Sequence, residues 1–96
     1  MERVSLDAYV LDALMPDLVG HDRRPSAFIV YLYLWRRSKS GTQSVCASHQ
    51  MLADGTGLSK GSVQGALRSL VRRQLLEVKR RNATAAPIYT LRCHWR

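Results

Sequence analysis

The chain has 96 residues, 46% of them hydrophobic, and 15 Lys and Arg against 7 Asp and Glu give it a net charge of +8. That length and composition suit one small folded domain and exclude disorder along the whole chain. The charge is uneven, because residues 1–22 carry five acids and one arginine, a net of −4, which leaves +12 on the rest. A basic body of this size favours a polyanionic partner, with nucleic acid first and an anionic membrane surface second, over a chain that is merely soluble and cationic.

The first predicted element is an amphipathic helix from Ser5 to Met15. Ser5 is placed to cap it, and Pro16 is expected to end it and to begin a polar connector over residues 17–24. The apolar positions that recur at helical spacing are Leu6, Tyr9, Val10, Ala13 and Leu14. We interpret residues 1–22 as a helical extension that either packs on its own domain or forms a dimer contact.

Residues 25–38 predict a second helix. Pro25 would occupy its first turn, a position that proline favours. Apolar side chains occupy nearly every side of it, including Phe28, Tyr31, Leu32 and Trp35. Such a helix must be covered on two faces. We expect one cover to be the helices that follow and the other to be the N-terminal helix or a second subunit, so a homodimer is expected through the Ser5–Met15 helix and the outer flank of this one.

Residues 48–76 read as two short helices joined by a glycine turn. Ser48 would cap the first helix, the run Gly55-Thr56-Gly57 would break it, and Ser59 would cap the second. The second helix has an apolar stripe made of Val63, Ala66, Leu67, Leu70 and Val71. Its opposite line lacks apolar side chains and consists of Gly61, Gly65, Arg68 and Arg72.

After Leu76 the pattern changes to the alternation of strands, with Leu76 and Val78 pointing inward. Residues 87–91 repeat it, with Tyr89 and Leu91 inward, and residues 42–47 are a further short strand candidate. The loop between the two later strands begins with basic residues. The predicted fold is therefore mainly α with a small antiparallel β-hairpin or sheet.

This pattern resembles the bacterial winged helix-turn-helix DNA-binding proteins, of the MarR-like or replication-initiator-like kind. The matching residues are Leu52, Ala53, Gly57, Leu58, Ser59, Val63, Leu67 and Leu70, followed by the basic, strand-like tail. The resemblance covers roughly residues 25–95 and implies a DNA-binding domain over residues 23–96. It also implies a recognition helix at 59–74 in the major groove and a wing at 79–86 on the backbone, in a regulator of transcription or replication.

A helix of about 15 residues is roughly 23 Å long and fits a major groove about 12 Å wide. Each glycine inside a helix costs up to about 1 kcal/mol, so Gly61 and Gly65 suggest close approach to DNA, with packing of Gly65 against a neighbour as the alternative. The expected DNA-binding residues are Ser59, Lys60, Gly61, Ser62, Gln64, Gly65, Arg68, Arg72, Arg73, Lys79, Arg80 and Arg81. Of these, Ser62, Gln64 and Arg68 would reach bases, and the remaining cations would meet phosphates.

Two other functions stay open: a protein-interaction module that binds an acidic partner, and a structured-RNA binder. We expect no enzyme, metal site or cofactor, because the glycines at 55–57 follow a helix instead of a strand, and no Ser, His and acid share a catalytic spacing. Cys46 and Cys93 are expected to be free, buried thiols. The apolar run at 27–35 is too short for a membrane span, and no signal peptide is evident. The expected location is cytoplasmic, at the nucleoid when DNA is bound.

Overall fold

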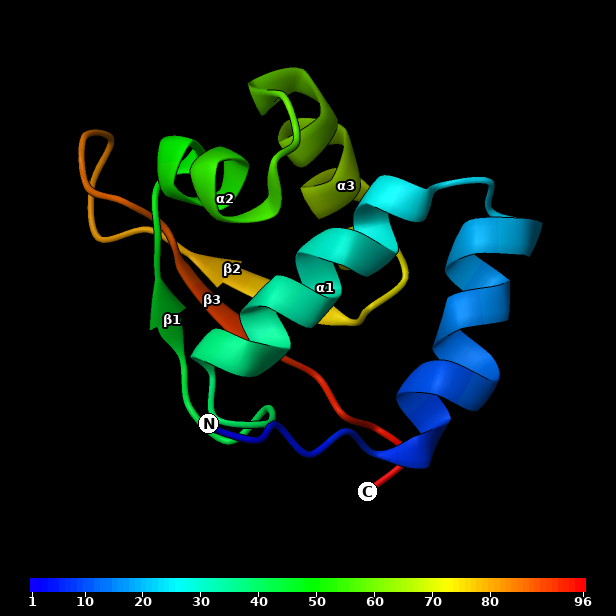
Figure 1. Ribbon diagram of the computed structural model, residues 1–96. Coiled ribbons are helices and arrows are strands. Elements are labelled where there is room, and N and C mark those ends of the chain that lie inside the picture. Colours follow the sequence, from blue (N-terminus) through cyan, green and yellow to red (C-terminus); the bar gives the residue numbers. More distant parts are fainter.

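The computed structural model describes residues 1–96, and its helices surround a central helix beside a small sheet (Figure 1). The helical elements are η1 (Val10–Leu14), η2 (Pro16–His21), α1 (Pro25–Arg37), α2 (His49–Thr56) and α3 (Lys60–Arg72). The strands are β1 (Val45–Cys46), β2 (Leu76–Lys79) and β3 (Ile88–Leu91), and they form one antiparallel sheet in the order β1-β3-β2. The predicted class, mainly α with a small antiparallel sheet, is confirmed.

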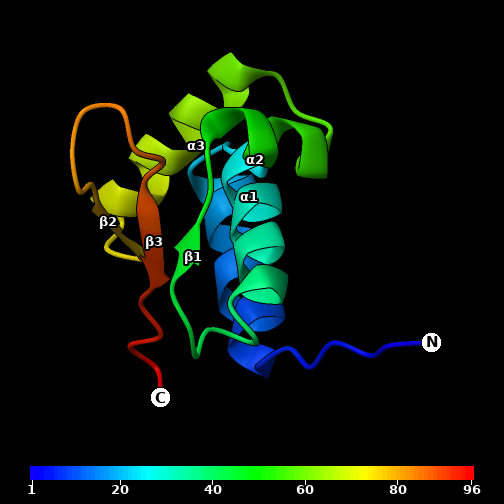
Figure 2. The same cartoon turned by 90° about the vertical axis from the view of Figure 1, so that its left-hand side faces the viewer.

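Helix α1 is the centre of a single core of 20 buried apolar residues. Its own buried side chains are Ala27, Phe28, Val30, Tyr31, Leu34 and Trp35. The N-terminal helical segment covers one side of it, while α2, α3 and the sheet lie on others (Figures 1 and 2). The expectation that α1 needs cover on two faces is confirmed, and both covers come from the same chain.

The N-terminal segment supplies Val10, Leu14 and Leu18 to this core, each no more than 4% exposed. Full burial of such a side chain is worth about 1.5–3 kcal/mol, so the segment is an integral part of the folded unit. The expected end at Pro16 is wrong, because helical turns run on through η2 to His21. These turns are wider than those of an α-helix, because each backbone hydrogen bond joins residues five positions apart, as between the Met15 N–H and the Val10 carbonyl. Pro16 occupies the first position of the second helical element, η2, where its missing N–H is not needed.

The predicted Ser5 cap is also wrong, since the helical turns begin three residues later. The Ser5 carbonyl instead accepts hydrogen bonds from Trp35 Nε1 at 2.7 Å and from Ser40 Oγ at 3.1 Å. Nearby, Asp7 Oδ2 accepts from Trp95 Nε1 at 2.9 Å and from Arg96 Nε at 2.7 Å, and these bonds lower the pKa of Asp7, that from Arg96 the most. The two ends of the chain are thus joined at one point of the molecule.

The two caps and the turn between α2 and α3 are as predicted. Ser48 Oγ accepts from the Met51 N–H and Ser59 Oγ from the Ser62 N–H, each at 3.1 Å, and Gly57 ends α2 with φ +80°. Gly55 does not break α2 as expected but lies within it. A Cβ there would stand 2.6 Å from the Tyr33 ring, so glycine permits α2 to pack closely on α1.

The sheet places Leu76, Tyr89 and Leu91 in the core, as the alternation predicts. Val78 and Val71 were expected inside as well but are 38% and 45% exposed, because they face an open groove between the hairpin and α3. The early strand is only two residues long, and Cys46 in it is exposed, contrary to expectation. No helix combines the length and the apolar character that a bilayer crossing requires.

Candidate nucleic-acid interface

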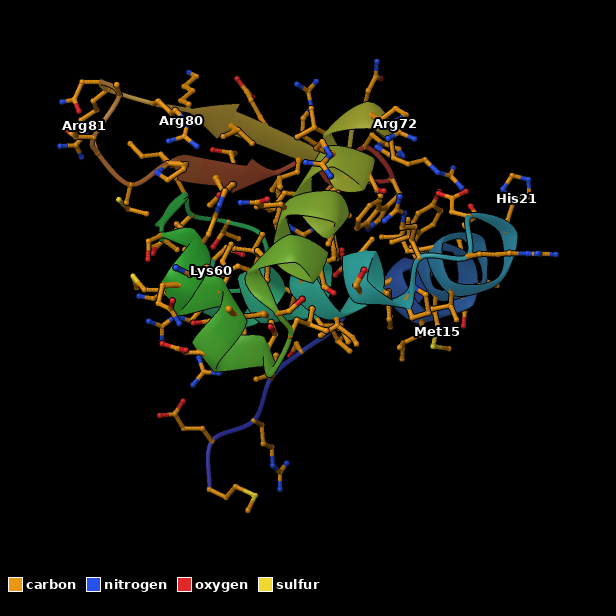
Figure 3. The ribbon with its side chains drawn as sticks, turned by 90° about the horizontal axis from the view of Figure 1, so that it is seen from above. Met15, His21, Lys60, Arg72, Arg80 and Arg81 are labelled. Carbon is orange, nitrogen blue, oxygen red and sulfur yellow. The ribbon has the colours of Figure 1, made fainter.

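Helix α3 turns one face to solvent and the other to the core. Val63, Ala66, Leu67 and Leu70 are buried, whereas the outer face is exposed and carries Gly61, Gln64, Arg68 and Arg72. Lys60 and Arg72 occupy the first and last positions of the helix, as Figure 3 shows. The helix therefore presents polar and cationic groups along its whole length, with no bulky apolar side chain on the central line of that face.

The loop between β2 and β3 stands beside α3 as a wing. Asn82 Oδ1 accepts from the N–H groups of Thr84 at 3.0 Å and Ala85 at 2.8 Å, which gives the loop a defined turn. Arg80 and Arg81 project from the start of this loop (Figure 3) and are exposed. The hairpin thus carries two long cations to the same side of the molecule as the outer face of α3.

A groove of about 540 Å³ separates α3 from the hairpin. Its apolar lining consists of Leu67, Val71, Val78 and Tyr89, and its polar lining of His49, Gln64, Arg68, Arg72 and Arg80. No carboxylate lines it. Guanidinium groups above an apolar surface suit a ligand whose phosphates are charged and whose sugars are less polar.

Ion pairing divides the basic residues into two groups. Five of the 15 pair with carboxylates, namely Arg36, Arg73, Lys79, Arg92 and Arg96. Of the ten cations that have no such partner, five lie on α3 and the wing, namely Lys60, Arg68, Arg72, Arg80 and Arg81, and five lie elsewhere, namely Arg3, Arg23, Arg24, Arg37 and Lys39. Unpaired cations on one face create the positive potential that attracts a polyanion.

The sequence predicts that Arg73 binds a phosphate, but in the structure this arginine is one of the cations paired with a carboxylate. Its Nε and Nη2 donate to the two carboxylate oxygens of Asp22 at 2.7 and 2.8 Å, which holds α3 to the end of η2. Those bonds, with a smaller contribution from His21, lower the pKa of Asp22 to about 2. Lys79 Nζ lies 3.9 Å from Glu77, a looser contact.

Gly65 was expected to face DNA directly, and the structure places it elsewhere. It is buried, and the position of a Cβ would be 3.0 Å from Arg24 Nη1, so the arginine lies over this point of the helix. The alternative, that Gly65 packs against a neighbour, is the one observed. Gly61 is open, with only Ser59 Oγ at 4.0 Å.

Two residues at this surface, Arg24 and His49, are not among those predicted from the sequence. Arg24 comes from the connector before α1, and no spacing in the sequence relates it to α3. His49 opens α2 and lies beside Gln64, with 3.5 Å between His49 Nδ1 and Gln64 Nε2. The sequence offered one signal for His49: it directly follows the Ser48 cap, at the start of the helix that packs against the predicted recognition helix.

Taken together, two capped helices joined at Gly57 and followed by a β-hairpin define a winged helix-turn-helix protein. Residues 24–76, more than half of the chain, match the family model described as a helix-turn-helix domain, and the chain belongs to that family. No curated protein and no solved structure shows a significant match to it. Membership of this family suggests DNA binding.

Proposed function

We propose that the protein binds duplex DNA, with α3 in the major groove and the wing on the backbone. The supporting observation is the set of five unpaired cations on α3 and the wing, Lys60, Arg68, Arg72, Arg80 and Arg81. Three of them, Arg68, Arg72 and Arg80, line a groove free of carboxylates. A helix of 13 residues is about 20 Å long and fits between the walls of a major groove.

The residues on α3 divide by position. Ser62, Gln64 and Arg68 lie on its exposed side and are assigned to base edges, since arginine reads guanine and glutamine reads adenine through paired hydrogen bonds. Lys60 and Arg72 at its two ends, with Arg80 and Arg81 on the wing, are assigned to phosphates. Binding of this kind is sequence-specific, and we propose a regulator of transcription or replication that acts in the cytoplasm at the nucleoid.

A homodimer is part of the proposal, but its surface is smaller than the sequence indicated. Both broad faces of α1 are covered within one chain, and Ile29 is its only large apolar side chain that stays exposed. The remaining apolar line runs along the outer side of the N-terminal segment and consists of Leu11, Met15 and Val19, each about 40% exposed. Two copies joined along this line would keep both α3 helices free.

Selection of bound duplexes from a random pool tests this function. We expect enrichment of one sequence, arranged as an inverted repeat if the dimer forms, and we expect Arg68→Ala to lose the preference at one base pair while still binding weakly. Matched RNA duplex should not compete. Failure to enrich any duplex, with retention of an acidic protein ligand instead, would overturn the proposal in favour of a protein-interaction module.

A further inference from the structure

A second concavity lies on the other flank of α3 from the wing groove. Its volume is about 320 Å³, and all five lining residues are polar or charged: Asp22, Arg24, Ser69, Arg72 and Arg73. The wing groove contacts α3 at Gln64, Leu67 and Val71, which lie on a different side of the helix. Arg72 borders both spaces, and Figure 3 shows it at the end of α3 far from the wing loop.

The concavity carries a net positive charge, because its one carboxylate, that of Asp22, is paired with Arg73. Both carboxylate oxygens of Asp22 accept from Arg73, so these two charges offset each other. Arg24 and Arg72 are left without a carboxylate. Ser69 is only 5% exposed, and it also lines the concavity. The space thus offers two guanidinium groups and a hydroxyl to an anion.

Gly65 gives independent support for a role of Arg24 at this place. A Cβ at residue 65 would stand 3.0 Å from Arg24 Nη1 and 4.0 Å from Arg68 Nη2, so two unpaired guanidinium groups converge on a bare stretch of helix. Glycine there costs up to about 1 kcal/mol of helix propensity.

We propose that Arg24, Arg72 and Ser69 form a clamp for one backbone phosphate of bound DNA. The inference rests on the proposed function and deepens it, because the recognition helix is then held by the backbone on both flanks, by the wing on one and by the clamp on the other. The guanidinium groups donate to phosphate oxygens, and the Ser69 hydroxyl donates a further bond. Gly65 serves by leaving room for Arg24.

The test compares Arg24→Gln with Arg3→Gln, a matched loss of one unpaired charge from the N-terminal tail. Fluorescence anisotropy of a labelled duplex is followed over a series of salt concentrations. We expect Arg24→Gln to weaken binding about tenfold at 0.1 M salt, on all duplexes alike, and to make the slope of log K against log salt shallower by about 0.9. Arg3→Gln should match the wild type, and both variants should keep its melting temperature.

A double-mutant cycle with Gly65→Ala tests the part played by glycine. We expect Gly65→Ala to weaken binding in the wild-type background and to add nothing in the Arg24→Gln background, since it acts by displacing Arg24. An equal loss in both backgrounds would assign Gly65 to direct DNA contact and overturn its place in the clamp.

Two further outcomes would overturn the inference. If Arg24→Gln binds duplex as Arg3→Gln does, the clamp is absent although DNA binding stands. If inorganic phosphate shifts the amide resonances around Ser69 at submillimolar concentration while duplex affinity is independent of Arg24, the concavity is a small-anion site. Absence of duplex binding by the wild type would instead contradict the proposed function itself.

Discussion

The N-terminal extension and the face of α3 use charge in opposite ways. Three of the five acidic residues before α1 bind arginines of the body: Glu2 pairs with Arg36, Asp7 with Arg96 and Asp22 with Arg73. Across the α3 and wing surface, five of the seven cations have no carboxylate partner, the exceptions being Arg73 and Lys79. Net charge alone therefore does not locate a binding surface, whereas several unpaired cations gathered on one face mark a candidate for one.

The apolar side chains of the two regions differ as well. The extension buries one line, Val10, Leu14 and Leu18, and leaves a parallel line of Leu11, Met15 and Val19 exposed. The exposed Val71 and Val78 lie instead in a groove bordered by Arg68, Arg72 and Arg80. The exposed line of the extension suits contact with another apolar surface. Val71 and Val78 in the groove suit a ligand that is both charged and partly apolar.

The largest effect is expected from removing the core contact of the extension. Leu18→Ala should lower the free energy of unfolding by about 2–5 kcal/mol, because the side chain is fully buried against the body of the domain. Thermal and urea unfolding measure this. The control Leu11→Ala, on the exposed line, should change stability by less than about 0.5 kcal/mol. Similar small losses for both would contradict the intrachain docking of the extension.

Removal of the wing cations should affect binding and leave folding unchanged. The double substitution Arg80→Ala and Arg81→Ala should weaken all duplexes by about 100-fold at 0.1 M salt, with a slope shallower by about 1.8, since two phosphate contacts are lost. Anisotropy titrations with several duplexes measure it. A change of base preference without a change of slope would show that the wing reads sequence.

Local rules predicted much of the fold. The caps at Ser48 and Ser59, the turn at Gly57 and the buried stripe of α3 depend on hydrogen bonds and spacing within one or two turns, which the sequence displays directly. Pro16 misled because a proline permits a new helical turn to begin as readily as it ends the preceding one.

The composition of the site was less predictable, because it depends on contacts between distant residues. Arg73 looks like its neighbour Arg72 in sequence, and only the approach of Asp22, 51 positions away, separates a paired cation from a free one. The contact between Arg24 and Gly65 likewise joins residues far apart in the sequence, so the spacing of residues does not reveal it. Val71 and Val78 match an inward pattern, yet both line the open groove between α3 and the hairpin and stay exposed.

Breaking the Asp22–Arg73 pair should have a moderate effect on stability that depends on pH. The folded-state pKa of Asp22, about 2, lies below its ordinary value of 3.8, so the pair stabilises the fold above pH 4 and this contribution is lost as the pH falls from 4 towards 2. Asp22→Asn should cost about 1 kcal/mol at pH 7, a discounted value for a partly exposed pair, and little at pH 2. Melting temperatures at both pH values measure this, with Asp12→Asn as the control.

The smallest effect on the folded monomer is expected at the exposed line of the extension. Met15→Glu should leave the monomer's stability within about 0.5 kcal/mol of the wild type, because Met15 is 41% exposed. In sedimentation at micromolar concentration we expect a wild-type dimer and a Met15→Glu monomer. A wild-type monomer under these conditions would contradict the proposed homodimer.

The salt dependence of duplex binding by two matched variants tests whether the unpaired cations of α3 and the wing mark the DNA-binding face. Arg72→Gln removes an unpaired cation from the phosphate-binding set of α3, and Arg92→Gln removes an exposed one that lies 3.7 Å from Glu77. We predict that Arg72→Gln weakens duplex binding at least tenfold and makes the salt slope shallower, while Arg92→Gln binds as the wild type does. Equal losses of affinity and slope in the two variants would show that total charge governs binding, and would overturn the assignment of the DNA-binding face to α3 and the wing.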